Sequence, residues 1–336
     1  MVQRESKPIK CKYCHSKNIY RFGHYKRIQR YFCNSCGRKF VNNDALPKMK
    51  TPVPIIADAL NSYYGGMSLD NIVDNIAQQT GVRMTDAGIY NWIVRFTKEA
   101  LNKTKDLHPI VGDKWIADEC MLDIGGKKTW HWDIIDTKTR YILATHLSHT
   151  RTTQDAKRLM EKATSVADKI PKVIVTDALR AYIDGIELTF GADTLHIQSS
   201  PFAEAGLSTN MIERWHSTLK TRTNIMRGLS NLKKAKLLLD GFVFYYNYFR
   251  PHESLDNRTP AKVAKIKTLY KDWTDVLRFS VPTVEQHAED TLMPRHYRFK
   301  MDSRNFKCRK PQAKRKRKQR KDEPTLTIYR MKRQIS

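Results

Sequence analysis

Two aspartates occur in or directly after predicted strands, at positions where the neighbouring residues are apolar and a charged side chain is unusual. The run Trp115–Ile124 alternates like a strand and places Asp118 on the same face as the apolar Ile116. Burying a carboxylate on such a face is costly unless something at the sheet surface needs it. Asp177 follows Val173–Val175 after one residue, Thr176, and this unbroken apolar run is typical of a buried parallel strand, at the end where α/β sheets bind ligands. The sequence therefore predicts a mixed sheet with a carboxylate on each of two strands.

The other elements of this segment are expected in a fixed order. A hairpin turn at Gly125-Gly126 joins the first strand to a second, and a third strand, a crossover helix and the buried parallel strand follow. Further helices and one short strand complete the unit. The predicted bounds are 129–135, 140–149 and 195–197 for strands, and 153–166, 178–190 and 232–248 for helices.

A third carboxylate, Glu213, is separated from Asp177 by thirty-five residues, in a segment with helical spacing that begins near Asn210. Carboxylates held close together repel one another unless divalent cations neutralise them. Hard oxygen ligands with open water positions suit Mg²⁺ or Mn²⁺, and two such ions roughly 3.5–4 Å apart suit phosphoryl transfer. We therefore expect Asp118, Asp177 and Glu213 to be catalytic and to hold two Mg²⁺ (or Mn²⁺) ions.

Each acid also has a simpler explanation. Asp177 can cap a helix or close a turn, and Glu213 can stabilise a helix N-terminus. Asp118 has rivals nearby, namely Glu119, Asp123, Asp133 and Asp136. The order of the three acids, their spacing and the basic surroundings together favour catalysis.

The N-terminal segment contains two C-x2-C pairs separated by eighteen residues, formed by Cys11, Cys14, Cys33 and Cys36. Each pair presents two thiolates on a tight turn, and two such turns close a tetrahedral four-sulfur zinc site. Short strands at 19–25 and 29–32 fit a zinc ribbon over residues 1–46. The alternative, disulfide or redox chemistry, is disfavoured by the tandem spacing. Such a closed site is structural, so catalysis needs another centre.

Residues 47–108 show three runs of helical period separated by glycine turns at Gly65-Gly66 and Gly81. This outline predicts a helix-turn-helix domain, whose last helix enters the DNA major groove. Tyr90, Asn91 and Arg95 lie off the apolar stripe of that helix and are expected to contact DNA. A small helical bundle that only connects domains is the alternative.

The net charge is +27, from 61 lysines and arginines against 34 acids. A polyanion partner explains such an excess best, because each contacted phosphate releases condensed counterions. Basic residues dominate 314–321, where we expect a solvated arm. No apolar run approaches the roughly 20 residues of a membrane-spanning helix, which predicts a soluble intracellular protein.

Taken together, these motifs resemble the DDE transposases of prokaryotic insertion sequences, in the retroviral-integrase superfamily. The resemblance covers about residues 105–265. It rests on Asp118 in Trp-Ile-Ala-Asp-Glu, Asp177 in Val-Thr-Asp-Ala, Asn210-x-x-Glu213 with Lys220 seven residues later, and the closing segment Tyr246–His252 followed by Leu255 and Pro260. It implies a ribonuclease H-like core, a mixed five-stranded sheet with helices, preceded by the zinc ribbon and the helix-turn-helix.

The resemblance also implies an activity and partners. Water as nucleophile gives 3′-end cleavage of a mobile element, and the liberated 3′-hydroxyl gives strand transfer into target DNA. Double-stranded DNA and a homodimer or larger assembly are the implied partners, and a cytoplasmic, nucleoid-associated location in a prokaryote is implied with them. Lys220, Arg214 and Arg222 are expected to contact DNA, with His216 as a neighbour. Two alternatives remain, a transposase-derived DNA-binding regulator without catalysis and a ribonuclease H-like nuclease.

These inferences divide the chain into four parts. They are a zinc ribbon (1–46), a helix-turn-helix domain (47–108), a DDE catalytic domain (109–265) and a basic, partly disordered C-terminal region (266–336) that includes a possible strand at 325–330.

Overall fold

The computed structural model describes residues 8–199, 208–226, 229–268 and 270–279. The basic arm at 314–321 and the possible strand at 325–330 lie outside the described residues. Within them, no helix is long and apolar enough to cross a membrane.

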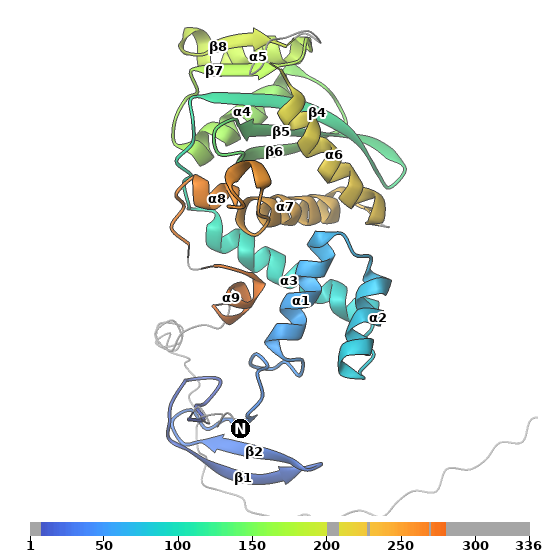
Figure 1. Ribbon diagram of the computed structural model, residues 1–336, viewed down its shortest axis with the longest axis vertical. Coiled ribbons are helices and arrows are strands. Elements are labelled where there is room, and N and C mark those ends of the chain that lie inside the picture. The colour runs from blue at the N-terminus through green and yellow to red at the C-terminus, as the bar shows by residue number, and fades with distance from the viewer. Residues whose placement is uncertain (1–7, 200–207, 227–228, 269, 280–336) are drawn as a thin grey trace, which may run out of the picture. The chain divides into compact units, whose positions relative to one another are not determined.

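The N-terminal segment forms a small antiparallel sheet. Its strands β1 (Ile19–Tyr25), β2 (Ile28–Cys33) and β3 (Lys39–Val41) are hydrogen-bonded in that order (Figure 1). Phe40 packs with the buried Cys11 and Cys33 in a core cluster separate from the main one. The cysteines are therefore a central part of the ribbon's own core.

Three helices follow, α1 (Val53–Gly65), α2 (Leu69–Thr80) and α3 (Asp86–Thr104). Their ends are set by local chemistry. The side chains of Ser68 and Thr85 each accept a backbone N–H in the first turn of α2 and α3. Gly66 and Gly81 end α1 and α2 with φ of 119° and 69°, a left-handed conformation that glycine adopts without strain. The three predicted helices and their glycine turns are confirmed.

The second sheet has the strand order β6-β5-β4-β7-β8. Strands β4 (Lys114–Ile124), β5 (Lys127–Asp136) and β6 (Ile142–Ser148) form an antiparallel meander, and β7 (Val173–Thr176) and β8 (Leu195–Gln198) run parallel to β4. Gly125 and Gly126, with φ of 64° and 75°, make the two-residue turn between β4 and β5. This is the predicted ribonuclease H-like sheet.

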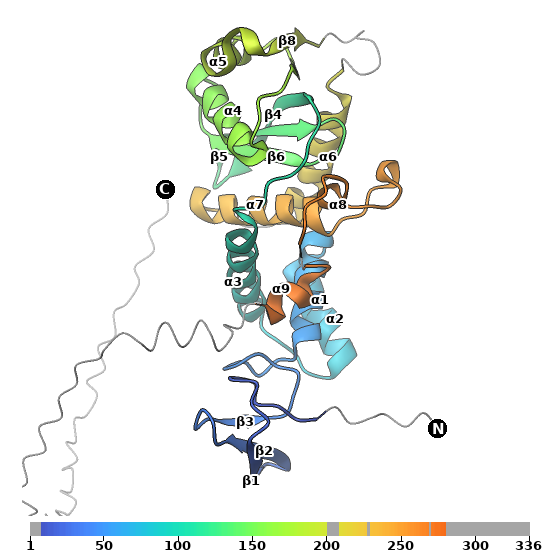
Figure 2. The same cartoon turned by 90° about the vertical axis from the view of Figure 1, so that its left-hand side faces the viewer.

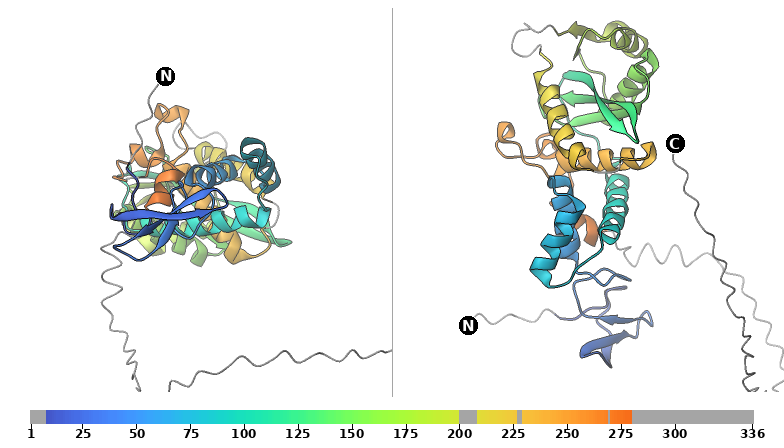
Figure 3. Two further views of the ribbon diagram at one scale, coloured as in Figure 1. Left: turned by 90° about the horizontal axis from the view of Figure 1, so that it is seen from below. Right: turned by 90° about the vertical axis from the view of Figure 1, so that its right-hand side faces the viewer.

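Helices cover the sheet on both faces. Helices α4 (Thr153–Ala167) and α5 (Arg180–Phe190) lie on one face and α6 (Asn210–Ile225) on the other, as Figure 2 and the right-hand view of Figure 3 show. The N-terminus of α4 carries a reciprocal capping box between Thr152 and Asp155. The remaining elements are α7 (Leu232–Tyr248), α8 (Pro260–Val263), α9 (Trp273–Arg278) and the 3-10 turns Gly191–Asp193 and Glu253–Leu255.

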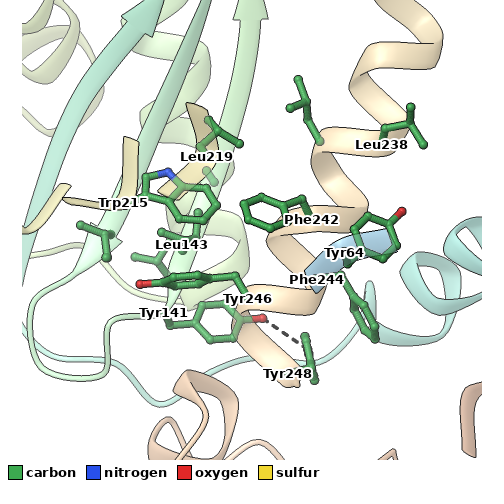
Figure 4. Packing of buried hydrophobic residues seen from close by; sticks show 14 of the residues in the cluster. Tyr64, Tyr141, Leu143, Trp215, Leu219, Leu238, Phe242, Phe244, Tyr246 and Tyr248 are labelled. Carbon is green, nitrogen blue, oxygen red and sulfur yellow. Dashed lines mark hydrogen bonds between the residues drawn. The ribbon is translucent and has the colours of Figure 1, made fainter. Parts of the chain in front are cut away.

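Helix α7 joins the sheet to the helical segment through one continuous apolar core. Its Phe242 stacks on Trp215 of α6 at a centroid distance of 5.7 Å (Figure 4). Phe244 packs near Trp273 of α9. The Asn247 side chain bonds both the N–H and the carbonyl of Ile142 in β6. A single core cluster therefore includes residues from Leu46 to Leu277.

Helix α7 lies close to Tyr64 of α1 and Thr97 of α3 at Gly241. A Cβ placed there would lie 2.2 Å from the Tyr64 hydroxyl and 2.6 Å from a Thr97 methyl carbon. We expect Gly241→Ala to lower the free energy of unfolding by about 1–3 kcal/mol, since overpacking outweighs the gain in helix propensity. Urea denaturation measures the change. Gly65→Ala is the control, because its nearest neighbour is the Tyr245 hydroxyl at 3.8 Å; equal stabilities of the two variants would contradict the expectation.

Candidate active site

Strand pairing brings the two predicted aspartates to the same place. Strands β4 and β7 run parallel with Ile116 opposite Val175, so Asp118 and Asp177 each lie two residues past the last pair. Carboxylate oxygens of Asp118, Glu119 and Asp177 all lie within 4.8 Å of one another. The Asp177 carboxylate also accepts the Leu179 N–H at 3.0 Å, so it closes a turn as well.

Glu213 is not a member of this cluster. It is exposed on the first turn of α6, where its Oε1 accepts a hydrogen bond from the Thr209 hydroxyl at 2.8 Å. One turn further along α6, the His216 ring lies 3.5 Å from the Asp118 carboxylate. The structure therefore brings Asp118 and Asp177 together and places the helix of Glu213 beside them. A catalytic role for all three acids stays a prediction.

A buried chain of polar groups lies beneath α6. The fully buried Asp133 carboxylate accepts hydrogen bonds from His131 Nδ1 at 2.8 Å and from His216 Nε2 at 3.0 Å. Because the other nitrogen of His216 faces Asp118, this ring bridges two carboxylates. The sulfur of Cys120 completes a buried group with His131 and Asp133.

This bridge changes the charge of the histidine. Burial alone would lower the pKa of His216, but its hydrogen bonds to Asp118 and Asp133 outweigh burial and raise the pKa to about 9. Burial opposes ionisation of Asp133 too, yet the two histidines hold the pKa of that carboxyl below its usual range. An imidazolium between two carboxylates therefore fixes the Asp118 side chain from behind. His216 is only 5% exposed, and its position next to DNA stays a prediction.

We expect Asp133→Asn to lower the free energy of unfolding by about 3 kcal/mol, because it removes the charge that compensates a buried imidazolium. The exposed Asp106→Asn is the control and is expected to stay within about 0.5 kcal/mol of the unchanged chain. Chemical denaturation at neutral pH measures both. If Asp133→Asn changed the free energy of unfolding no more than the control does, the interaction between Asp133 and a charged His216 would contribute nothing to stability.

Glu119 differs from Asp118 and Asp177, the other two acids of the cluster, because its carboxylate is already paired with a basic side chain. It forms an ion pair with Arg151, and its side chain is almost wholly buried. Burial raises the pKa of the Glu119 carboxyl to about 7, against the lowering effects of Tyr182 and Arg151; Asp177 and Asp118 raise it further. This accumulation of negative charge is what a divalent cation would relieve, so the carboxylates fit Mg²⁺.

The residues predicted to contact DNA have different environments. Lys220 and Arg214 are exposed on α6, whereas Arg222 is 3% exposed at its end. On α3, Asn91 is exposed, Tyr90 packs partly against the core, and Arg95 is paired with Glu99 at 3.1 Å. All six stay predictions as DNA contacts.

The four N-terminal cysteines converge as expected. Their sulfurs lie within 4.8 Å of one another, with separations of 3.7 Å for Cys11–Cys36 and 3.5 Å for Cys14–Cys33. A disulfide holds its sulfurs about 2.05 Å apart. A tetrahedral zinc site with Zn–S bonds of about 2.3 Å separates them by roughly 3.8 Å. The cluster therefore has the dimensions of a structural zinc site.

The sequence interpretation missed the buried partners of Asp118, although a signal for them existed. A two-residue turn at Gly125-Gly126 fixes the register of the hairpin, and this register places Asp118 opposite Asp133 and Cys120 opposite His131. The rotation of α6 that brings in His216 has no such signal.

The strand order and the crossover helix define a ribonuclease H-like fold. Within this fold class, residues 112–252 match the family model described as DDE domain, of the IS240 transposase type. The chain therefore carries a DDE domain of the transposase and integrase type, and the resemblance drawn from the sequence is confirmed. Among curated proteins, none is similar enough to count as a match.

Several solved structures are similar at low identity. The catalytic core of HTLV-2 integrase in complex with magnesium is 13% identical, with a TM-score of 0.37, and the match covers 47% of this chain and 99% of that one. The simian T-cell lymphotropic virus intasome in complex with PP2A regulatory subunit B56 gamma is 13% identical over 65% of this chain and 77% of that one, with a TM-score of 0.38. The BIV integrase core is 16% identical over 46% and 94%, with a TM-score of 0.35. The fold class rests on the strand order and not on these likenesses.

Proposed function

We propose that this protein is a DNA transposase that cuts the 3′ ends of a mobile element and joins them to target DNA. The observation that carries the proposal is the meeting of Asp118 and Asp177 where the pairing of β4 with β7 ends, inside a DDE domain. The net charge of +27 supports a DNA substrate.

In this proposal Asp118 and Asp177 hold two Mg²⁺ (or Mn²⁺) ions, and Glu213 joins them from α6. Bound there, the ions activate the attacking oxygen and stabilise the leaving oxygen of the phosphodiester. His216 and Asp133 keep the Asp118 carboxylate in place. Lys220, exposed on α6 two turns after Glu213, attracts a substrate phosphate. Water as nucleophile gives cleavage, and a DNA 3′-hydroxyl gives strand transfer.

The other modules bind the element ends. The zinc ribbon, held by a Zn²⁺ ion at Cys11, Cys14, Cys33 and Cys36, and helix α3 supply DNA contacts. Two ends must be joined in one reaction, which requires at least a homodimer. The protein acts at the nucleoid of a prokaryotic cell.

The test is incubation of the purified chain with labelled element-end DNA, a target plasmid and Mg²⁺. Labelled ends joined to the plasmid support the proposal. Binding of the ends without any product points to the regulator instead, and cleavage of RNA–DNA hybrid alone points to the nuclease.

A further inference from the structure

A cavity of about 360 Å³ lies where the C-terminal turn of α1 meets α6 and α7. The aromatic rings of Tyr64 and Phe242, both labelled in Figure 4, line part of it. Its polar lining comes from Ser217, Thr218, Thr221, Arg222, Tyr245 and Arg250. It is distinct from the carboxylate cluster, since none of those three acids lines it.

Arg222 is the unusual member of this lining. It is only 3% exposed, and its Nη1 donates to the Met67 carbonyl at 3.3 Å. The guanidinium also lies over the Tyr63 ring, 4.1 Å from its centroid. Its Nε and Nη2 are buried without a hydrogen-bond partner. No acid in the described ranges forms an ion pair with it.

A buried, unpaired guanidinium is costly, because it stays ionised and water cannot solvate it. The two free donors, Nε and Nη2, form one edge of the guanidinium plane. This edge is the fork that binds two oxygens of a carboxylate or phosphate at once. Arg222 is one of the residues that line the cavity, and the described residues supply no anion for its two unpaired donors.

Other groups in the lining favour a phosphate. Arg250 adds a second positive charge. It forms no ion pair with any acidic residue in the part of the chain that the structure describes. Burial raises the pKa of Tyr245, although Arg250 opposes the shift, so its hydroxyl keeps its proton at neutral pH. The exposed Ser217 is a further hydroxyl donor. Two arginines with hydroxyl donors match a phosphodiester, which has one charge and several acceptor oxygens.

We propose that this cavity is a phosphate site that holds one backbone phosphodiester of bound DNA between the fork of Arg222 and Arg250. The inference rests on the proposed DNA-binding function and adds a defined contact at the junction of α1 and α6. It explains why a charge is kept in a core position. A phosphate held there couples α6, which also carries Glu213 and His216, to the helical segment.

The test compares Arg222→Met with the unchanged chain in DNA binding across a range of salt concentrations, by fluorescence anisotropy on an element-end duplex. Loss of one phosphate contact should weaken binding about tenfold and make the slope of log K against log salt shallower by about 1. The control is Arg158→Met, which removes one exposed arginine on α4 and should leave the slope unchanged. Arg222→Lys keeps the charge but loses the fork, so it should recover only part of the affinity.

Stability separates this site from a merely structural arginine. Methionine fills a similar volume without a buried charge, so Arg222→Met should keep or raise the melting temperature in chloride. Inorganic phosphate, compared with chloride at equal ionic strength, should raise the melting temperature of the unchanged chain but not of Arg222→Met. A lower melting temperature of Arg222→Met with an unchanged salt slope would overturn the proposal in favour of a structural role. A phosphate-dependent shift with an unchanged slope would assign the site to a free anion and overturn its assignment to DNA.

These outcomes are independent of the transposase proposal. A shallower slope in Arg222→Met, together with no strand transfer by the unchanged chain, leaves the phosphate site standing while the proposed activity fails. Strand transfer by Arg222→Met with the salt dependence of the unchanged chain would refute the phosphate site and leave the proposed activity standing.

Discussion

Asp118→Asn, Asp177→Asn and Glu213→Gln should each reduce Mg²⁺-dependent DNA cleavage by about a thousandfold or more. The reason is that each change removes one charged oxygen ligand of the divalent ions. The ions would then be bound less well, and the negative charge of the transition state would be less well stabilised. The affinity for DNA should fall little, since phosphate contacts come from cations elsewhere. Single-turnover cleavage of labelled element ends measures the first effect, and anisotropy on the same duplex measures the second.

Glu119→Gln is the matched control, because Glu119 lies in the same cluster but is already paired with Arg151. It should retain cleavage within about tenfold of the unchanged chain. Loss of cleavage in Glu119→Gln with full activity in Glu213→Gln would exchange the roles of these two glutamates. Substantial cleavage by Asp118→Asn or Asp177→Asn would refute the site itself.

The second large effect concerns the N-terminal cysteines. Cys33→Ser should abolish zinc binding and unfold residues 8–46, since the thiolates form the centre of the ribbon's small core. Structural zinc contributes roughly 10–16 kcal/mol to the folding of comparable units, far more than three short strands can replace. Metal analysis should find one zinc per chain before the change and almost none after it, with rapid proteolysis confined to the ribbon.

Cys120→Ser is the control for this experiment. Cys120 is buried in β4, outside the ribbon, so this variant should keep one zinc per chain. Zinc that remains at full stoichiometry in Cys33→Ser, or that disappears in Cys120→Ser, would contradict the assignment. Treatment of the unchanged chain with a chelator should reproduce the proteolysis pattern of Cys33→Ser and leave the sheet of the DDE domain folded.

Much of the fold could be predicted because local chemistry and sequence period agree. Ser68, Thr85 and Thr152 are hydrogen-bonding residues placed directly before apolar helical repeats, and each caps a helix. The apolar run before Asp177 and the Gly125-Gly126 turn fix the parallel strand and the hairpin in the same way.

The rest of the site depends on how α6 packs, and sequence period does not determine that. It does not show that His216 faces the sheet while Glu213, one turn earlier, is exposed outside the acid cluster. Nor does it show that the turn after α1 buries Arg222, a contact between residues 155 positions apart. Such distant contacts decide which charges are solvated, so Arg222, which the sequence predicts as a DNA contact, is found buried.

The shared core that includes residues from Leu46 to Leu277 limits how this protein can be re-engineered. A chimera in which another DNA-binding domain replaces α1–α3 would leave the apolar surface of α7 exposed to solvent, and this surface would promote aggregation. Retargeting is better attempted by exchanging the ribbon, whose separate core makes it the portable module, or by changing exposed side chains on α3 one at a time.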